Sequence, residues 1–537
     1  MTLRVLSSGL EVPEVVRTQL ADDDVAARLV GKDVTLWGPE AEAEASVRLG
    51  WLDLPATSRE LLARLTGLRA ELAAEGLDRV VLAGIGGSSL AAGVVCRTAG
   101  VPLVVLDTTD PGQVAAAMTD LHRTVVVVSS KSGGTVEADS HRRAFLAAFA
   151  EAGLDDTQVG RRFVVVTDPG SPLAETAAAM GARAVFLADP HVGGRYSALS
   201  AFGLVPAALA GVDVTPLLDD AADLAEHLAE PGNAALELGV AIGAGFRTGR
   251  DKIALVDGGT RGDGTRIEGF GDWVEHLVAE STGKQGRGVL PVVLESVDAP
   301  GVAAPDALLA VVGGGPVEGR PSVGVTGPLG AQFLGWEYAT AVAGRVLGIN
   351  PFDQPDGTGS REDTARILDG GPPDKRPVTT LGAVRLHASG GVLDGVDLSQ
   401  TDGLTLALDA LLAAVPPRGY LAVTAYLDRQ ADARAGELRA ALARRSRHAV
   451  TFGWGPRFLH STGQYHAGGP QVGVHLQLTG AVAQDLPVPD RPYSFGTLQA
   501  AQAAGDRQAL ADRQRPLLHL HLTDRSAGID QVLRAAA

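Results

Sequence analysis

One stretch of the chain, from Thr124 to Thr135, limits the possible fold more than any other. It holds four consecutive valines, followed by Ser129-Ser130-Lys131-Ser132-Gly133-Gly134-Thr135. A short valine run is typical of a strand that is buried on both faces of a parallel sheet. Open α/β sheets bind ligands where such strands end, and hydroxyls, glycines and a lysine before the next helix suit a phosphate dianion. The stretch therefore predicts a phosphate-binding loop in an α/β protein.

Strand, loop and helix patterns alternate along most of the chain. In residues 61–210 we predict strands at 79–83, 103–106, 125–128, 163–166 and 184–187. Residues 211–368 have a similar layout, with strands at 253–256, 289–294, 308–312 and 323–325 and an apolar helix over 332–347. This alternation predicts two units, each with a doubly wound parallel sheet covered by helices on both faces.

Three other segments complete the chain. Residues 1–60 show helical spacing with acidic clusters, and nothing in them suggests a site. Residues 369–378 contain glycines and prolines that oppose helix formation, which predicts a linker. Residues 379–537 predict a C-terminal α/β block with strands at 421–424, 450–452, 472–476 and 517–522 and a helix over 431–445.

Composition narrows the class of protein. A chain of 537 residues is too long for one core, and its net charge of −17 argues against a broad nucleic-acid surface. The single cysteine, Cys96, cannot form an intramolecular disulfide and is expected to be a small core residue. We find no apolar run that could cross a membrane and no secretory leader pattern. We therefore expect a cytoplasmic protein.

A second glycine-rich loop, Gly84-Ile85-Gly86-Gly87-Ser88-Ser89, also follows a predicted strand. A dinucleotide fingerprint would need a later glycine where Ser89 stands, so NAD binding is disfavoured. The alternatives are a tight structural turn or a ligand site in which Gly87 admits a substrate and Ser88 supplies a hydroxyl. With the Ser130–Thr135 loop two strands later, the pair favours a sugar phosphate.

Five motifs together resemble the phosphoglucose isomerase family, over roughly residues 61–368. They are the 84–88 loop, the 129–135 loop, Gly193-Gly194-Arg195-Tyr196-Ser197, Glu280-Ser281-Thr282-Gly283-Lys284 and Ile349-Asn350-Pro351-Phe352-Asp353-Gln354. The resemblance implies two sugar-isomerase (SIS) subdomains with the active site between them. It also implies a homodimer whose sites borrow residues across the interface, a sugar-phosphate substrate, and neither metal nor redox cofactor.

The resemblance assigns roles that the chemistry supports. Isomerising a hexose phosphate requires a base that carries a proton between C1 and C2, and Glu280 is the candidate. Arg195 is expected to stabilise the enediolate. By resemblance, Ser88, Ser130, Lys131, Ser132 and Thr135 are expected to hold the phosphate, while Gly87 lets the backbone approach the substrate.

The chain departs from the family in the residues that open the sugar ring. The family's histidine precedes its Phe-Asp-Gln motif, but residues 285–354 contain no histidine. The nearest match to its segment is Leu459-His460-Ser461-Thr462-Gly463-Gln464, which makes His460 the candidate, with His466 as an alternative. Gln354 is expected to assist. Arg361 stands where the family has a lysine, and it keeps the charge but cannot donate a proton near neutral pH.

Two further histidine positions are open to more than one interpretation. His276 lies one helical turn before Glu280, where the family commonly has glutamine, and it either contacts substrate or is a packed core residue. His519 and His521 alternate as on one strand face, but no further ligand accompanies them, so a metal site is disfavoured.

The sequence thus predicts a glucose-6-phosphate isomerase. The alternatives are a bifunctional phosphoglucose/phosphomannose isomerase and a non-catalytic sugar-phosphate-binding protein of the same fold. The non-catalytic protein would not need Glu280 or Arg195, yet both are present. We also find no helix-turn-helix pattern of the kind that a DNA-binding regulator would carry.

Overall fold

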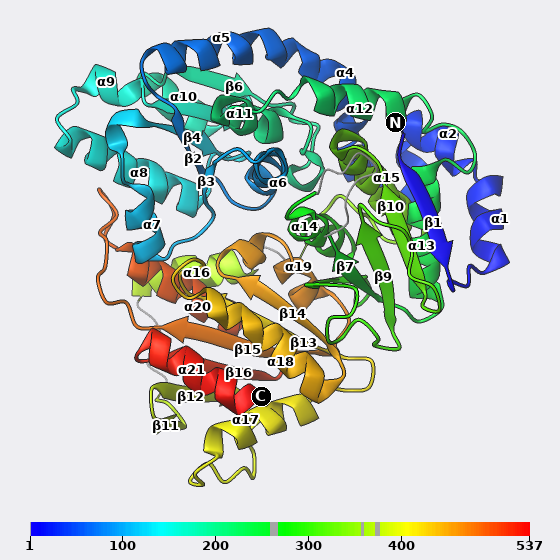
Figure 1. Cartoon of the computed structure of the whole chain (residues 1–537), viewed down its shortest axis with the longest axis vertical. Helices are drawn as coiled ribbons and strands as arrows, with labels where there is room; N and C mark the ends of the chain where they lie inside the picture. The colour runs from blue at the N-terminus through cyan, green and yellow to red at the C-terminus, as the bar shows by residue number, and fades with distance from the viewer. Residues whose placement is uncertain (1, 258–266, 356–358, 371–375) are drawn as a thin grey trace.

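Three sheets, each with helices packed against it, make up the computed structural model, which describes residues 2–257, 267–355, 359–370 and 376–537 (Figure 1). The first sheet belongs to residues 61–210 and the third to residues 379–537. The second is formed by strands of residues 211–368 together with one strand from the N-terminus. The predicted α/β class is confirmed.

The first sheet is parallel throughout, with strand order β3-β2-β4-β5-β6. Its strands are β2 (Arg79–Ala83), β3 (Val104–Leu106), β4 (Thr124–Ser129), β5 (Phe163–Thr167) and β6 (Ala184–Leu187). Its helices are α5 (Leu61–Ala74), α6 (Leu90–Ala99), α7 (Pro111–Ala117), α8 (Val136–Glu151), α9 (Asp156–Gly160), α10 (Pro172–Ala179) and α11 (Ala201–Ala210). Every residue of β4 is buried, as the valine run predicts.

The strand order explains why two glycine-rich loops matter. From β2 the chain crosses to β3 on one side and then returns to β4 on the other, so the order reverses between β2 and β4. A crevice forms at the carboxyl ends of strands at such a switch point. The loops after β2 and β4 are the two that the sequence singles out.

The second sheet has strand order β1-β10-β9-β7-β8. Its strands are β1 (Arg4–Ser8), β7 (Lys252–Val256), β8 (Leu290–Val293), β9 (Ala307–Val312) and β10 (Ser322–Thr326). Its helices are α12 (Thr215–Ala225), α13 (Ala234–Arg247), α14 (Phe270–Thr282) and α15 (Leu329–Leu347), whereas the following helix α16 (Gly359–Gly370) packs against α20 of the third unit. The four strands β7 to β10 are parallel, and β1 is added antiparallel to β10.

Strand β1 corrects the expectation that residues 1–60 are only helical. It is an edge strand without a fully buried residue, so it lacks the apolar alternation by which strands are recognised. The rest of this segment is helical, with α1 (Glu14–Asp22), α2 (Val25–Val30), α3 (Glu42–Ala45), α4 (Leu54–Thr57) and short 3₁₀ turns.

The third sheet has strand order β11-β12-β16-β15-β13-β14. Its strands are β11 (Thr379–Leu381), β12 (Val384–Ser389), β13 (Tyr420–Tyr426), β14 (Ala449–Trp454), β15 (Gly473–Gly480) and β16 (Leu517–Leu522). Its helices are α17 (Gly403–Ala413), α18 (Glu437–Ser446), α19 (Gly463–Gly468), α20 (Phe495–Asp512) and α21 (Arg525–Ala536). The antiparallel edge pair β11 and β12 was not predicted from the sequence.

The cores show how the three units are joined. One apolar core runs through the N-terminal segment and the first two units, whereas the third has a core of its own. A smaller cluster unites the second and third units by packing Tyr420 and Tyr465 against Leu290 and Leu309. The third unit, yellow to red in Figure 1, thus lies against the other two.

Two further expectations concern membrane-spanning helices and the predicted linker over residues 369–378. Among the described residues, no helix combines the length and apolar character needed to cross a membrane. The predicted linker overlaps the end of α16, and its central residues, 371–375, lie outside the described residues.

Candidate active site

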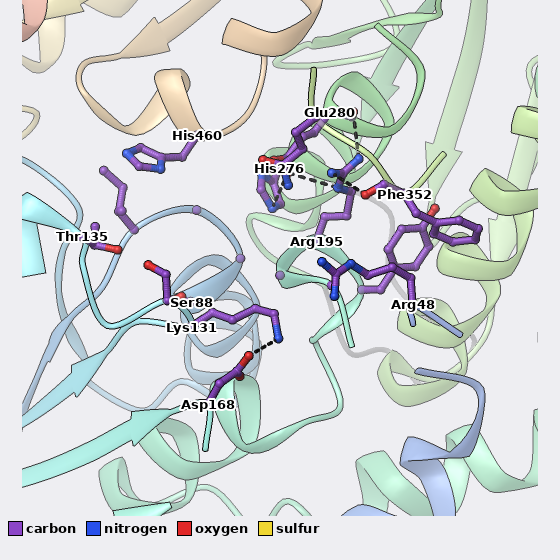
Figure 2. A pocket seen from close by; sticks show the side chains of 18 of the residues that line it. Arg48, Ser88, Lys131, Thr135, Asp168, Arg195, His276, Glu280, Phe352 and His460 are labelled. Carbon is purple, nitrogen blue, oxygen red and sulfur yellow. Dashed lines mark hydrogen bonds and ion pairs between the residues drawn. The ribbon is translucent and has the colours of Figure 1, made fainter. Parts of the chain in front are cut away.

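A cavity of about 530 Å³ lies where the three units meet, and it collects most of the predicted residues (Figure 2). The predicted residues that line it are Gly87, Ser88, Lys131, Ser132, Thr135, Arg195, His276, Glu280, Gln354, Arg361 and His460. Ser130 and the alternative histidine, His466, are the predicted residues that are not among those lining the cavity. Side chains more than 300 residues apart in sequence thus share one pocket.

The loop after β4 is shaped by its own hydroxyls. The Ser130 hydroxyl lies 2.8 Å from that of Thr135, and it accepts a hydrogen bond from the Gly133 backbone N–H at 3.2 Å. Gly133 has φ of +70°, a conformation that favours glycine. Ser130 therefore holds the loop closed, while Ser132 and Thr135 present hydroxyls to the cavity at the start of α8.

Lys131 enters the cavity beside a carboxylate that the sequence reasoning did not identify. Its ammonium group donates to Asp168 at 2.5 Å, and both side chains are less than a quarter exposed. Burial raises the pKa of Asp168, although Lys131 beside it acts in the opposite direction. Lys131 is thus positioned for an anion at this end of the pocket.

Gly87 is where two loops meet. It belongs to the 3₁₀ turn η4 (Gly86–Ser88), which touches the turn η6 (Gly194–Tyr196) that carries Arg195. A Cβ atom at position 87 would lie 2.1 Å from the Gly194 carbonyl oxygen, far inside contact distance. Glycine at this position therefore lets Arg195 approach the first glycine-rich loop.

The Glu280 carboxylate lies between a cation and a histidine. Arg195 Nε is 3.4 Å and His276 Nε2 is 3.5 Å from Glu280 Oε2. Glu280 and His276 come from successive turns of α14, as their spacing predicts. Burial lowers the pKa of His276, so its imidazole is neutral near pH 7, and neither ring nitrogen has a hydrogen-bond partner among the described residues. Figure 2 shows these three side chains together, across the pocket from Thr135, Ser88 and Lys131.

The Arg195 guanidinium also fixes the backbone around the pocket. Its Nη1 donates to the carbonyl oxygens of Glu280 (2.9 Å) and Pro351 (3.1 Å), and its Nη2 to those of Phe352 (3.3 Å) and Asp353 (3.2 Å). With Nε facing the carboxylate, all five N–H groups are directed at protein oxygens. Arg195 can thus supply positive charge to the site, but it has no N–H left for a ligand.

Lys284 explains why the glutamate motif and the Phe-Asp-Gln motif occur together. Its buried ammonium group donates to the Asn350 and Asp353 carbonyl oxygens at 2.7 Å and to the Asp353 carboxylate at 2.6 Å. Burial and the nearby Arg195 charge lower the pKa of Lys284 to about 8. Two cations therefore hold the segment that brings Gln354 to the pocket.

His460 reaches the pocket from the third unit, on the 3₁₀ turn η8 (Arg457–His460) that follows β14. Its Nε2 lies 3.3 Å from Glu137 Oε1, and its Nδ1 lies 3.4 Å from Arg361 Nη2. Burial alone would raise the pKa of Glu137, but His460 and Arg361 outweigh burial and lower it. Because an ionised carboxylate only accepts hydrogen bonds, Nε2 carries the proton and Nδ1 is the basic nitrogen.

The other candidate histidines lie elsewhere. His466 is buried on α19, away from the cavity wall, where its Nδ1 lies 3.0 Å from the Tyr420 hydroxyl and burial lowers its pKa to about 3. His519 and His521 share the Thr479 hydroxyl, at 2.8 and 2.9 Å. The part of the chain that the structure describes contains no group of three or more His, Cys, Asp or Glu side chains arranged to hold a metal.

Besides Asp168, three side chains in or beside the pocket were missed from the sequence: Glu137, Glu44 and Arg48. Glu137 stands in the first turn of α8, where a carboxylate is common because it complements the helix dipole. Glu44 and Arg48 line the cavity from the N-terminal segment, so the expectation that residues 1–60 contribute nothing to a site is wrong. Glu137 follows the phosphate-loop motif by two residues, and that spacing was the one signal available.

Comparisons with known proteins match the part of the chain that holds the first three motifs. The sequence profile of the family described as phosphoglucose isomerase matches residues 62–248. A glucose-6-phosphate isomerase of Rubrobacter xylanophilus is 29% identical over 412 residues, which are 62% of this chain and 93% of that protein. A protein of Haloarcula marismortui named "Probable glucose-6-phosphate isomerase" is 33% identical over 234 residues, 40% of this chain. The chain spans about half the length of that archaeal relative, at 49%.

Two solved structures resemble the fold. A hypothetical protein from Thermus thermophilus has a TM-score of 0.53 and 25% identity, covering 67% of this chain and 99% of that one. A glucose-6-phosphate isomerase from Chlamydia trachomatis also has a TM-score of 0.53, covering 68% of this chain and 88% of that one. At 19% identity, this second likeness concerns the fold alone.

Proposed function

We propose that this chain, which is similar to phosphoglucose isomerases in its sequence, interconverts glucose 6-phosphate and fructose 6-phosphate. The proposal rests chiefly on one observation: the Glu280 carboxylate and the His460 imidazole line the same pocket as the phosphate loop. A base, a ring-opening group and an anion site are the three parts that an aldose–ketose isomerisation of a cyclic sugar phosphate needs.

The first step in our mechanism is ring opening. With Nε2 donating to Glu137, Nδ1 is the His460 nitrogen that can exchange a proton with the sugar's anomeric hydroxyl or ring oxygen, in place of its 3.4 Å contact with Arg361 Nη2. Arg361 lies beside Nδ1 and stabilises the negative charge that develops on oxygen. Gln354, on the same wall, is suited to bind a hydroxyl of the opened chain.

Proton transfer follows. Glu280 removes the proton from C2 of the aldose and returns it to C1, while the proton of the C2 hydroxyl passes to O1, so that the carbonyl moves from C1 to C2 through a cis-enediolate. The intermediate carries negative charge, which the Arg195 guanidinium stabilises through space because its N–H groups are already bonded. This stabilisation is stronger in the transition state than in the ground state, in which C1 and C2 of the sugar carry no charge, and that difference is the condition for catalysis.

The test is isomerase activity of the purified protein with both sugar phosphates, together with a Glu280→Gln variant. Loss of a general base typically costs about 10²–10⁴-fold in rate, and glutamine preserves the size of the side chain. An unchanged turnover number in Glu280→Gln would remove Glu280 as the base. An inactive wild-type protein that still binds sugar phosphate would support the non-catalytic alternative.

Further parts of the proposal extend beyond the site. Mannose 6-phosphate, the C2 epimer, is to be assayed in parallel, because turnover would make the enzyme bifunctional. From the family resemblance we propose a cytoplasmic homodimer that acts in glycolysis and gluconeogenesis without metal or redox cofactor. Light scattering coupled to gel filtration tests the dimer, and fractionation of the source cells tests the location.

A further inference from the structure

We infer that Gln502, in the third unit, is a positioning residue for ring opening: together with Thr109 it holds the Glu137 carboxylate that orients His460. This inference rests on the proposed isomerase function and deepens it. It also gives the C-terminal block a role beyond supplying the histidine, because Gln502 lies on α20, far from η8 in sequence.

The contacts form an unbroken series across two units. The Thr109 hydroxyl donates to Gln502 Oε1 at 2.6 Å, and Gln502 Nε2 donates to Glu137 Oε1 at 2.6 Å. The same Glu137 oxygen lies 3.3 Å from His460 Nε2. Thr109, Gln502 and Glu137 are each at most 3% exposed, so water does not replace these bonds.

The direction of this series defines the protonation of the histidine. The Gln502 amide donates to Glu137 only while its Oε1 faces Thr109, whose hydroxyl can donate to that oxygen. A carboxylate that receives this hydrogen bond is stabilised in its ionised form. It then accepts a hydrogen bond from His460 Nε2–H, which leaves Nδ1, 3.4 Å from Arg361 Nη2, as the basic nitrogen. Residues that orient a catalytic histidine in this way act through it, without touching the substrate.

The experiment separates ring opening from proton transfer at carbon. Gln502→Leu keeps the approximate volume and removes the amide, and glucose 6-phosphate requires ring opening. Erythrose 4-phosphate cannot close a ring because its O4 carries the phosphate, so deuterium incorporation at its C2 reports proton transfer alone. We expect the turnover number for glucose 6-phosphate to fall by about 10–100-fold, as when the partner of an oriented histidine is removed, with little change in deuterium incorporation.

Two more variants make the result specific. Gln499→Leu is the matched control, since Gln499 lies one turn earlier on α20, is 4% exposed, and faces Asp110 at 3.5 Å instead of the histidine pair. It should leave both reactions unchanged. Gln502→Glu, which is nearly isosteric, places a second carboxylate beside Glu137, so the pair retains a proton to higher pH. The acidic limb of its pH–rate profile should then move to higher pH.

Each outcome has one meaning. If Gln502→Leu slows both reactions equally, or neither, the positioning role is overturned. If Gln502→Leu does not fold, the pH profile of Gln502→Glu decides, and an unshifted acidic limb overturns the inference. An isomerase assay of the wild-type protein comes first. An inactive wild-type protein refutes the proposed function itself, whereas an active one makes the Gln502 variants a test of the positioning role alone.

Discussion

Replacing Arg195 with lysine separates the charge of this side chain from its hydrogen bonds. The guanidinium directs five N–H groups at protein oxygens, four of them backbone carbonyls at 2.9–3.3 Å. A lysine ammonium has three donors, so at least two of these contacts are lost. At about 1.5 kcal/mol for each hydrogen bond that involves a charged group, the loss is about 3 kcal/mol. If the whole of this loss is added to the activation free energy, the turnover number drops about 100-fold.

The assay is the turnover number for fructose 6-phosphate, coupled to a dehydrogenase that oxidises glucose 6-phosphate, alongside Tm from circular dichroism. Arg195→Met, which also removes the charge, should be slower than Arg195→Lys because the enediolate loses its counter-charge. Equal rates for the two variants would show that the charge contributes nothing. A lysine variant with wild-type turnover and Tm would refute the reasoning from hydrogen bonds.

Three further predictions use other parts of the molecule. Gly87→Ala places a Cβ atom 2.1 Å from the Gly194 carbonyl oxygen, so the two turns must separate. Because small displacements in a site are costly, kcat/KM should fall at least about tenfold. An unchanged kcat/KM would show that the two turns can separate without affecting the site. His460→Ala should lower the turnover number for the cyclic hexose phosphates by about 10²–10⁴-fold, but it should lower the rate of deuterium incorporation into erythrose 4-phosphate much less. Equal losses in the two rates would show that His460 does not act in ring opening. Burial and Asp272 raise the pKa of Glu275 to about 8, so between its ordinary pKa and 8 the folded state holds a proton that the unfolded state has released. The free energy of unfolding should therefore fall with rising pH, by up to about 1.4 kcal/mol per pH unit, and urea unfolding of Glu275→Gln should show a weaker decline; parallel curves would contradict this.

The strands that carry the phosphate loops could be predicted because their signal is local. A buried parallel strand needs a continuous apolar run, and the predicted ends of β2, β4 and β5 agree with the structure within one residue. Strand β1 has no such signal, since an edge strand exposes most of its residues. The sequence thus predicts buried elements well and edge elements poorly.

Contacts between distant residues were beyond reach of the sequence for a different reason. Glu137 meets His460 across 323 positions and Gln502 across 365. No periodicity or spacing rule relates positions so far apart, and each of these side chains alone resembles an ordinary polar residue of a helix. His460 was identifiable because its surrounding segment keeps the family's pattern, even though that segment stands in a different order along the chain.

The altered order makes physical sense once the third unit is considered as part of the site. In the proposed mechanism the histidine has to reach the sugar ring in the pocket, and the chain can follow any path that brings it there. The family resemblance implies sites completed across a dimer interface, yet here His460 reaches the pocket from the same chain that supplies Glu280 and Arg195. The imidazole is held by a carboxylate of the first unit, which is itself held by an amide of the third. Docking of the third unit onto the first therefore does for this pocket what the family resemblance assigns to a partner subunit, and any dimer that forms is not needed to bring His460 to Glu280.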